Sequence, residues 1–239
     1  MRENYLAYRN RIQGLINQRA CFPPENEQLV TAAGLKNKFC EDGSFHTFYG
    51  DTIVFQLSED TKQFLGEIQT SLYGQAAEIL AEKLPVESFH ITLHDLSSSA
   101  FQQDIRTEME AHQDRMPEIM SFLKGKRTVY LKAKGMVSMV STSIVMLFEP
   151  AGVEDHDTIQ EMYEYIENIC SLPYPLTMHC TLAYYKPGIY APKQWGKLYQ
   201  LIDVFNRKYA GKRKFVMDTH MMEYQVFTSM KDYITAYGA

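Results

Sequence analysis

The chain contains little cysteine and no long hydrophobic run. Its four cysteines, Cys21, Cys40, Cys170 and Cys180, form no Cys-x-x-Cys pair. A disulfide-stapled secreted domain has a denser cysteine framework, and a zinc site has closer spacing, so we interpret all four as reduced thiols. No apolar stretch reaches the length of a bilayer-spanning helix, which predicts no membrane partner.

An excess of positive charge is also lacking. The formal net charge is −5, whereas a surface that binds duplex DNA is usually strongly basic. The first five residues carry charges where a signal peptide has an apolar run. We therefore expect a cytoplasmic protein with no duplex DNA partner, in which a local basic cleft is still possible.

The 239 residues, 45% of them hydrophobic, suffice for one large domain or two joined lobes. Two His-x-Thr-Leu runs stand out, His90–Leu93 and His179–Leu182. Each lies in a short apolar, β-branched segment that is typical of a β-strand. Side chains alternate along a strand, so each histidine shares a face with the threonine two residues on, while Ile91 and Cys180 point the other way.

These residue types fit proton transfer at a phosphate. An imidazole titrates near neutral pH and can take or give a proton. A threonine hydroxyl can donate a hydrogen bond to an anionic oxygen. One such strand makes half a site, and a single histidine on a strand is more often structural. Two strands facing each other supply a base, an acid and two hydroxyl donors, which is enough to cleave a phosphodiester without a metal.

The order strand, helix, His-strand, helix, Gly-Lys-Arg, strand occurs twice. Gly125-Lys126-Arg127 follows the first histidine by about 35 residues, and Gly211-Lys212-Arg213 follows the second by about 32. We predict an α+β fold with two mainly antiparallel sheets facing a central cleft and helices outside. The predicted domains are an N-terminal helix and arm (1–44), one bilobal domain (45–230, with lobes of about 45–135 and 136–230) and a tail (231–239).

In these features the sequence resembles the two-histidine (2H) phosphoesterase superfamily, which includes LigT-like 2′-5′ RNA ligases and 2′,3′-cyclic nucleotide phosphodiesterases. Both His-x-Thr motifs of that group are intact here. Gly50–Ile53, Leu84-Pro85 and Leu182–Tyr184 are similar to runs in an uncharacterised bacterial branch. The resemblance covers roughly residues 45–230 and implies a duplicated, two-lobe LigT-like fold.

The resemblance implies a phosphodiesterase acting on a 2′,3′-cyclic phosphate or related 2′-linked ester of an RNA 3′ or 5′ end or a small nucleotide, with no cofactor. His90 and His179 would be the acid and base, in an order that the sequence leaves open, and Thr92 and Thr181 would hold the phosphate. The alternatives are RNA 2′-5′ ligation, a non-catalytic RNA-end or nucleotide-binding module, and a scaffold with coincidental motifs. Oligomeric state is not predicted.

Four further residues are candidates for substrate binding. His94 and Tyr185 are expected on the same faces as the two motifs, and Asp95 on the opposite face. Lys186 follows at the strand end, and Tyr49 lies in the turn before the first strand. Structural packing or solvation is the competing explanation for each of these residues.

A metal site is the alternative that a third histidine raises. His90, His94 and His179 would be its ligands, but no Asp or Glu stands at an obvious ligand spacing. We therefore predict no metal.

Overall fold

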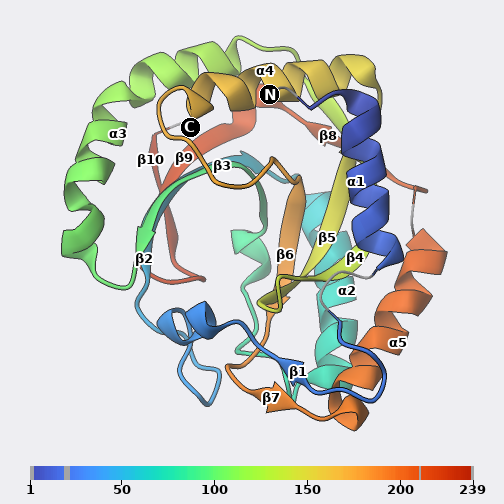
Figure 1. The fold of residues 1–239 in the computed structure, drawn as a ribbon. Coiled ribbons are helices and arrows are strands. Elements are labelled where there is room, and N and C mark those ends of the chain that lie inside the picture. The colour runs from blue at the N-terminus through green and yellow to red at the C-terminus, as the bar shows by residue number, and fades with distance from the viewer. Residues whose placement is uncertain (1–2, 19–21, 210, 238–239) are drawn as a thin grey trace.

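The computed structural model, drawn in Figure 1, describes residues 3–18, 22–209 and 211–237. The helices are α1 (Tyr5–Asn17), α2 (Glu59–Ala76), α3 (Gln102–Lys124), α4 (Val153–Glu167) and α5 (Pro192–Tyr209), with 3-10 turns η1 (Ala33–Asn37), η2 (Val86–Ser88) and η3 (Thr219–Met221). The strands are β1 (Leu29–Val30), β2 (Tyr49–Gln56), β3 (His90–Ser99), β4 (Val129–Met139), β5 (Ser143–Pro150), β6 (His179–Tyr184), β7 (Ile189–Tyr190), β8 (Lys214–Met217), β9 (Met222–Phe227) and β10 (Tyr233–Tyr237). Within the described ranges no helix is both long and apolar enough to cross a bilayer.

Two four-stranded antiparallel sheets form the body of the molecule. Their strand orders are β10-β9-β2-β3 and β6-β5-β4-β8, and β1 pairs with β7 in a small separate ladder. Each His-x-Thr strand is therefore the edge strand of its sheet. The predicted α+β class with two antiparallel sheets is confirmed.

The sheets do not follow the predicted lobe boundary near residue 135. β4 joins the second sheet, although it follows the first His-strand in sequence, and β9 returns to the first sheet beside β2. The 231–239 segment is also more than a tail, because β10 extends the first sheet. Strand partners so distant in sequence leave no local pattern that could have revealed them.

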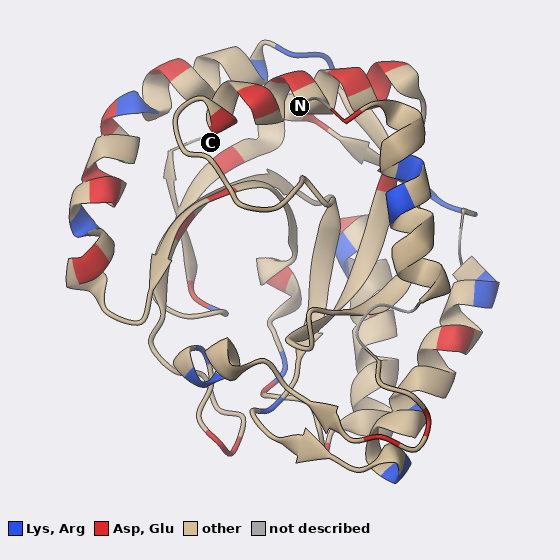
Figure 2. Cartoon of the chain, viewed as in Figure 1, with Lys and Arg blue, Asp and Glu red and all other residues tan. Residues whose placement is uncertain are grey.

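Helices pack on the outer sides of the two sheets. α3 packs on β3, β9 and β2, whereas α1 and α5 pack on the second sheet and α2 contacts α5 and β6. Ser58 begins α2 as expected, because its side chain accepts a hydrogen bond from the Thr61 amide. Figure 2 shows that most charged residues lie on these outer helices and the loops, which leaves the inner strands largely free of charge.

The N-terminal arm is anchored to the second sheet. The predicted N-terminal helix is present as α1 over Tyr5–Asn17, while residues 1–2 and 19–21, including Cys21, lie outside the described ranges. α1 contacts β4 and β5 through buried Tyr8 and Ile12. The arm that follows runs through β1 and η1 to the start of β2.

A buried carboxylate ties the first sheet to α3. Asp51 on β2 accepts hydrogen bonds from the Ser97 amide (2.9 Å) and hydroxyl, from His112 Nδ1 of α3 (2.8 Å) and from the Tyr224 hydroxyl of β9 (3.0 Å). The Asp51 side chain is fully buried, so each of these donors depends on it. The network fixes β2, β3 and β9 under one helix.

Replacing Asp51 by Ala should lower the free energy of unfolding by about 3–5 kcal/mol, because it strands a buried histidine and three other donors. Urea unfolding followed by circular dichroism measures the change. Asp114→Ala, at an exposed position of α3, is the matched control and should shift stability by no more than about 0.5 kcal/mol. A loss of under about 1 kcal/mol in Asp51→Ala would contradict the role of the network.

Candidate active site

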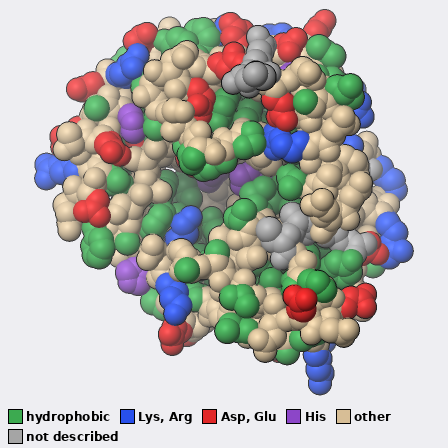
Figure 3. Space-filling model, in the orientation of Figure 1, with side chains coloured by type: hydrophobic (Ala, Val, Ile, Leu, Met, Phe, Trp, Pro, Cys, Tyr) green, Lys and Arg blue, Asp and Glu red, His purple; other side chains and the backbone are tan. Residues whose placement is uncertain are grey.

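The two His-x-Thr strands face each other where the sheets meet. β3 and β6 are in contact, and the backbone N–H of His90 donates a hydrogen bond to the Cys180 thiol. Figure 3 shows a hollow in this face of the molecule with histidine side chains at its bottom. The structure therefore brings the two predicted histidine strands together from opposite sheets.

Both catalytic candidates are held in the same way. His90 Nδ1 lies 2.8 Å from the Ser88 carbonyl oxygen, and His179 Nδ1 lies 2.7 Å from the Thr177 carbonyl oxygen. A carbonyl oxygen only accepts, so each Nδ1 carries a proton and each neutral ring keeps its lone pair on Nε2. Each imidazole thus has one nitrogen fixed by the chain and the other available for proton transfer.

The surroundings of His90 shift its pKa strongly. Burial lowers the pKa of His90 to about 4, outweighing the hydrogen bond to Ser88 and the charge of Asp95, which raise it. The charges of His179 and Lys62 lower it further, which places both groups near the His90 ring. The Tyr233 ring of β10 packs edge-on against His90 at 4.9 Å between centroids. His90 is therefore neutral at physiological pH.

The threonines alternate with buried residues, as the strand periodicity predicts. Thr92 and Thr181 are partly exposed, whereas Ile91 and Cys180 are fully buried. The Thr181 hydroxyl hydrogen-bonds to the Tyr184 hydroxyl. Cross-strand pairing puts His90 and Thr92 opposite Gln56 and Val54 of β2, on one face of the sheet.

The prediction that His94 shares this face is wrong, because β3 carries a β-bulge. The register shifts between Ile53 and Val54, so that Leu93 is an extra residue and His94 turns away. The His94 side chain is fully buried, with Nε2 3.3 Å from Glu167 of α4 and its ring 4.9 Å from that of Tyr163. Burial lowers its pKa, and its role is structural.

The same bulge brings Asp95 onto the cleft face, opposite Thr52, although the alternation predicts the reverse. Asp95 is exposed and accepts a hydrogen bond from the Tyr174 hydroxyl at 3.1 Å. Its charge raises the pKa of His90, so the carboxylate lies within electrostatic range of the site.

A matching bulge at Leu182 of β6 places Tyr184 on the cleft face, where Tyr185 was predicted. Thr181 pairs with Val145 and Ala183 with Ile144, so Leu182 is the extra residue. Tyr185 is consequently fully buried, with its hydroxyl bonded to Ser138, and the prediction that it lies on the cleft face is wrong. Tyr184 takes that position, which makes it the structural equivalent of Asp95 in the other sheet.

The remaining two substrate candidates lie elsewhere. Lys186 packs over Gly43, and its charge adds to the Ser44 hydrogen bonds that lower the pKa of Asp42. Tyr49 pairs with Ser99 at the far end of the β2–β3 ladder, about 20 Å along the strand from His90. The expected place of Tyr49 beside the site is therefore wrong, and substrate binding by Lys186 stays a prediction.

The N-terminal helix holds the second motif in place. Arg11 donates to the Thr177 hydroxyl (2.9 Å) and the Leu176 carbonyl (2.7 Å), next to the carbonyl that anchors His179. The buried Tyr8 hydroxyl accepts from the Met178 amide and donates to the Phe148 carbonyl. α1 therefore packs behind the second sheet and fixes the approach to His179.

The alternative metal site does not form. His94 faces the core, away from His90, so the proposed set of three histidines is not assembled. Across the described part of the chain, no three His, Cys, Asp or Glu side chains converge in a way that could hold a metal ion.

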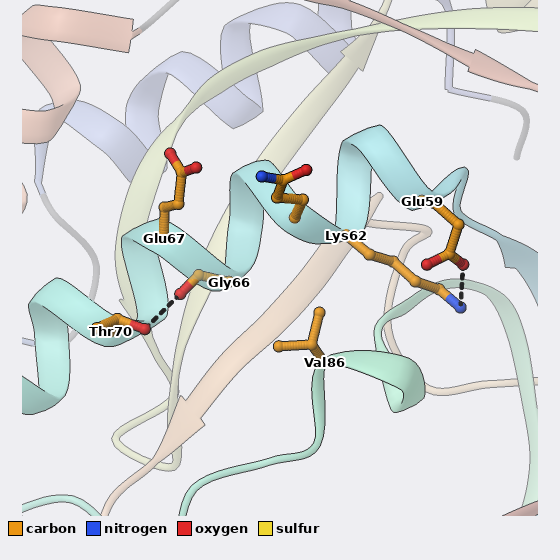
Figure 4. Close-up of a pocket in the computed structure, with 7 residues that line it drawn as sticks. Glu59, Lys62, Gly66, Glu67, Thr70 and Val86 are labelled. Carbon is orange, nitrogen blue, oxygen red and sulfur yellow. Dashed lines mark hydrogen bonds and ion pairs between the residues drawn. The ribbon is translucent and has the colours of Figure 1, made fainter.

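A separate pocket lies along α2 (Figure 4). Lys62 there forms an ion pair with Glu59 (3.8 Å), and the Thr70 hydroxyl donates to the Gly66 carbonyl (2.9 Å). The pocket contains none of the predicted site residues, and its lysine, Lys62, is already paired with Glu59. It offers no chemistry comparable to the paired histidines.

Comparison with known proteins identifies a solved structure with the same fold. No protein-family model matches the chain, and no curated protein matches it in sequence. The conserved protein of unknown function ATU0111 from Agrobacterium tumefaciens str. C58 matches with a TM-score of 0.69 at 18% identity, over 87% of this chain and 93% of that one. The chain therefore shares the fold of ATU0111.

Members of the 2H group are also among the solved structures that match. LigT of E. coli complexed with 3′-AMP matches with a TM-score of 0.47 at 10% identity, over 80% of this chain and 96% of LigT. The protein TT0787 of Thermus thermophilus matches with a TM-score of 0.47 at 12% identity, over 79% of this chain and 95% of that one.

Several residues at the site are missed by reasoning from the sequence. Tyr233 lies on a strand within the predicted tail, and Tyr184 and Asp95 reach the cleft only through the bulges. Lys62 comes from an amphipathic helix in which it has the pattern of an ordinary surface charge. The short run Leu182–Tyr184, which carries part of the resemblance, is the one signal that points at Tyr184.

Cys180 should resist alkylation, because burial raises the pKa of its thiol to about 12. Iodoacetamide at about pH 8, near the ordinary pKa of a thiol, should modify exposed Cys40 and spare Cys180 in the folded protein, and should modify both in urea. Peptide mass spectrometry measures the labelling of each site. Labelling of native Cys180 at the rate of Cys40 would show that β6 is not packed against β3 as described.

Proposed function

We propose that the protein is a phosphodiesterase of the 2H type that hydrolyses 2′,3′-cyclic phosphates or related 2′-linked diesters of RNA ends or nucleotides without a metal. One observation carries this proposal: two His-x-Thr strands meet edge to edge, each with its histidine Nδ1 bonded to the carbonyl two residues before it. A scaffold has no use for two imidazoles anchored alike at the bottom of one hollow.

In this mechanism His90 is the general base. Its low pKa leaves Nε2 unprotonated, ready to take a proton from water as the water oxygen bonds to phosphorus. His179 is the general acid, which gives a proton from Nε2 to the ribose oxygen as the bond between that oxygen and phosphorus breaks. Thr92 and Thr181 donate hydrogen bonds to the nonbridging oxygens, where negative charge builds up.

The competing function is a binding module that recognises an RNA end without turnover. Such a module needs the hydroxyl donors but not two imidazoles with free Nε2 atoms. The low pKa of His90 favours catalysis, because a hydrolase needs an unprotonated group that can accept a proton from water. Ligation of a 2′-5′ bond is the same chemistry run backwards and uses the same residues.

Replacing either histidine should abolish most of the activity. With 2′,3′-cyclic nucleotides and EDTA present, His90→Ala and His179→Ala should each lower kcat by at least ~10²-fold, because each removes one proton-transfer group. His220→Ala, at an exposed histidine, is the control and should behave as wild type. Binding of nucleotide by wild type without turnover would favour the module, and activity lost on adding EDTA would refute metal independence.

The pH dependence of kcat/KM should show whether His90 is the base. If His90 is the base, kcat/KM rises with pH through about 4, because the reaction needs the neutral imidazole. Tyr233→Ala exposes the ring to water, so the acidic limb should move upward toward about 6.5, the ordinary value for histidine. NMR titration of the His90 ring protons measures the same pKa without turnover. A wild-type limb near about 6.5 would reverse or remove the assignment.

A further inference from the structure

Beyond the histidines, the cleft continues along an aromatic wall. The ring of Tyr233, in contact with His90, packs at 5.1 Å from Phe227, which stacks at 6.2 Å on Phe48. On the opposite strand Tyr184 packs at 5.0 Å against Phe39 of the arm. Phe39 of the N-terminal arm therefore packs beside Tyr184, the residue that the β6 bulge turns toward the cleft face.

Lys38 stands at the end of this wall. It follows η1 directly, and its ammonium lies 4.9 Å from the centre of the Phe48 ring. Burial lowers its pKa, and the charge of Asp95 partly offsets that effect, so Lys38 lies within electrostatic range of the cleft face of β3. Lys38 is partly buried, and its ammonium loses hydration for which a partner anion would compensate.

Lys38 differs from the lysines with largely buried side chains because it lacks an anionic partner among the described residues. Lys62, Lys126 and Lys134 have largely buried side chains, and each forms an ion pair with a glutamate at 2.6–3.8 Å. No carboxylate of the described residues comes within 4.0 Å of the Lys38 ammonium. Its nearest aromatic contact is a ring face, which attracts a cation but cannot neutralise it.

We propose that Lys38 binds a second anionic group of the substrate, so that the cleft accepts a nucleotide with a terminal phosphate besides the phosphodiester at the histidines. This inference rests on the proposed function for the place of the first phosphate. Asp95 lies three residues beyond Thr92, about 10 Å at most along the strand, which is the scale of one nucleotide. The Asp95 carboxylate repels an anion bound between the histidines and Lys38, and it accepts hydrogen bonds from sugar or base donors.

Binding measurements test the subsite without turnover. In calorimetry, wild type should bind adenosine 3′,5′-bisphosphate about tenfold more tightly than adenosine 3′-monophosphate, since a charge-assisted contact contributes this much. Lys38→Met should remove the preference and leave affinity for the monophosphate within twofold. Lys36→Met, at an exposed position of η1, is the matched control and should keep it.

Kinetics separate this inference from the proposed function. Lys38→Met should lower kcat/KM about tenfold for a 5′-phosphorylated 2′,3′-cyclic nucleotide and leave the 5′-hydroxyl substrate within twofold. Equal affinity of wild type for the two adenosine ligands, or equal kinetic losses on both substrates in a variant with wild-type thermal unfolding, would overturn the subsite. A bisphosphate preference without any hydrolysis would keep the subsite and refute the phosphodiesterase.

Discussion

The contact between two sheet edges is the constraint on which the site depends. An edge strand presents unpaired backbone groups, and here the edges of both sheets are turned toward each other rather than to solvent. The His90 amide finds its partner in the Cys180 thiol of the opposing strand. Because faces alternate with a period of two, this contact also decides what enters the hollow: a slip of one residue would present Ile91 and Cys180 in place of the imidazoles.

A nearly symmetric frame holds the two histidines. Both rings are fixed through Nδ1 by a carbonyl two residues earlier, so the chain gives them the same tautomer and the same free nitrogen. The contacts that differ between the two histidines come from elements outside the repeated part of the chain. Tyr233 of the last strand shields His90, whereas the anchor of His179 is held by Arg11 of the first helix. The two ends of the chain thus give the two histidines different neighbours.

Sequence patterns predicted the parts of this site that depend on local periodicity. The two strands, the alternation of His90 with Thr92 and the α+β class follow from spacing and composition. The predicted faces of His94 and Tyr185 were wrong, because a bulge inserts one residue and reverses the face of every side chain after it. Neither Leu93 nor Leu182 is a residue type that signals a bulge. The exchange of strands between the two halves of the sequence could not be predicted for a different reason. It depends on pairing between segments that are far apart in the chain.

The paired bulges divide the cleft into two chemically different regions. Before them the two strands present the same groups, histidine and threonine, which suits a phosphorus centre whose nonbridging oxygens are equivalent. After them the equivalent positions hold a carboxylate on one side, Asp95, and a phenol on the other, Tyr184. A nucleotide is chiral and differs at its two ends, so only the second region can set its orientation. Under the proposed function, recognition of the nucleotide would come from the part of the cleft where the two halves differ, and the chemistry would take place in the part where they match.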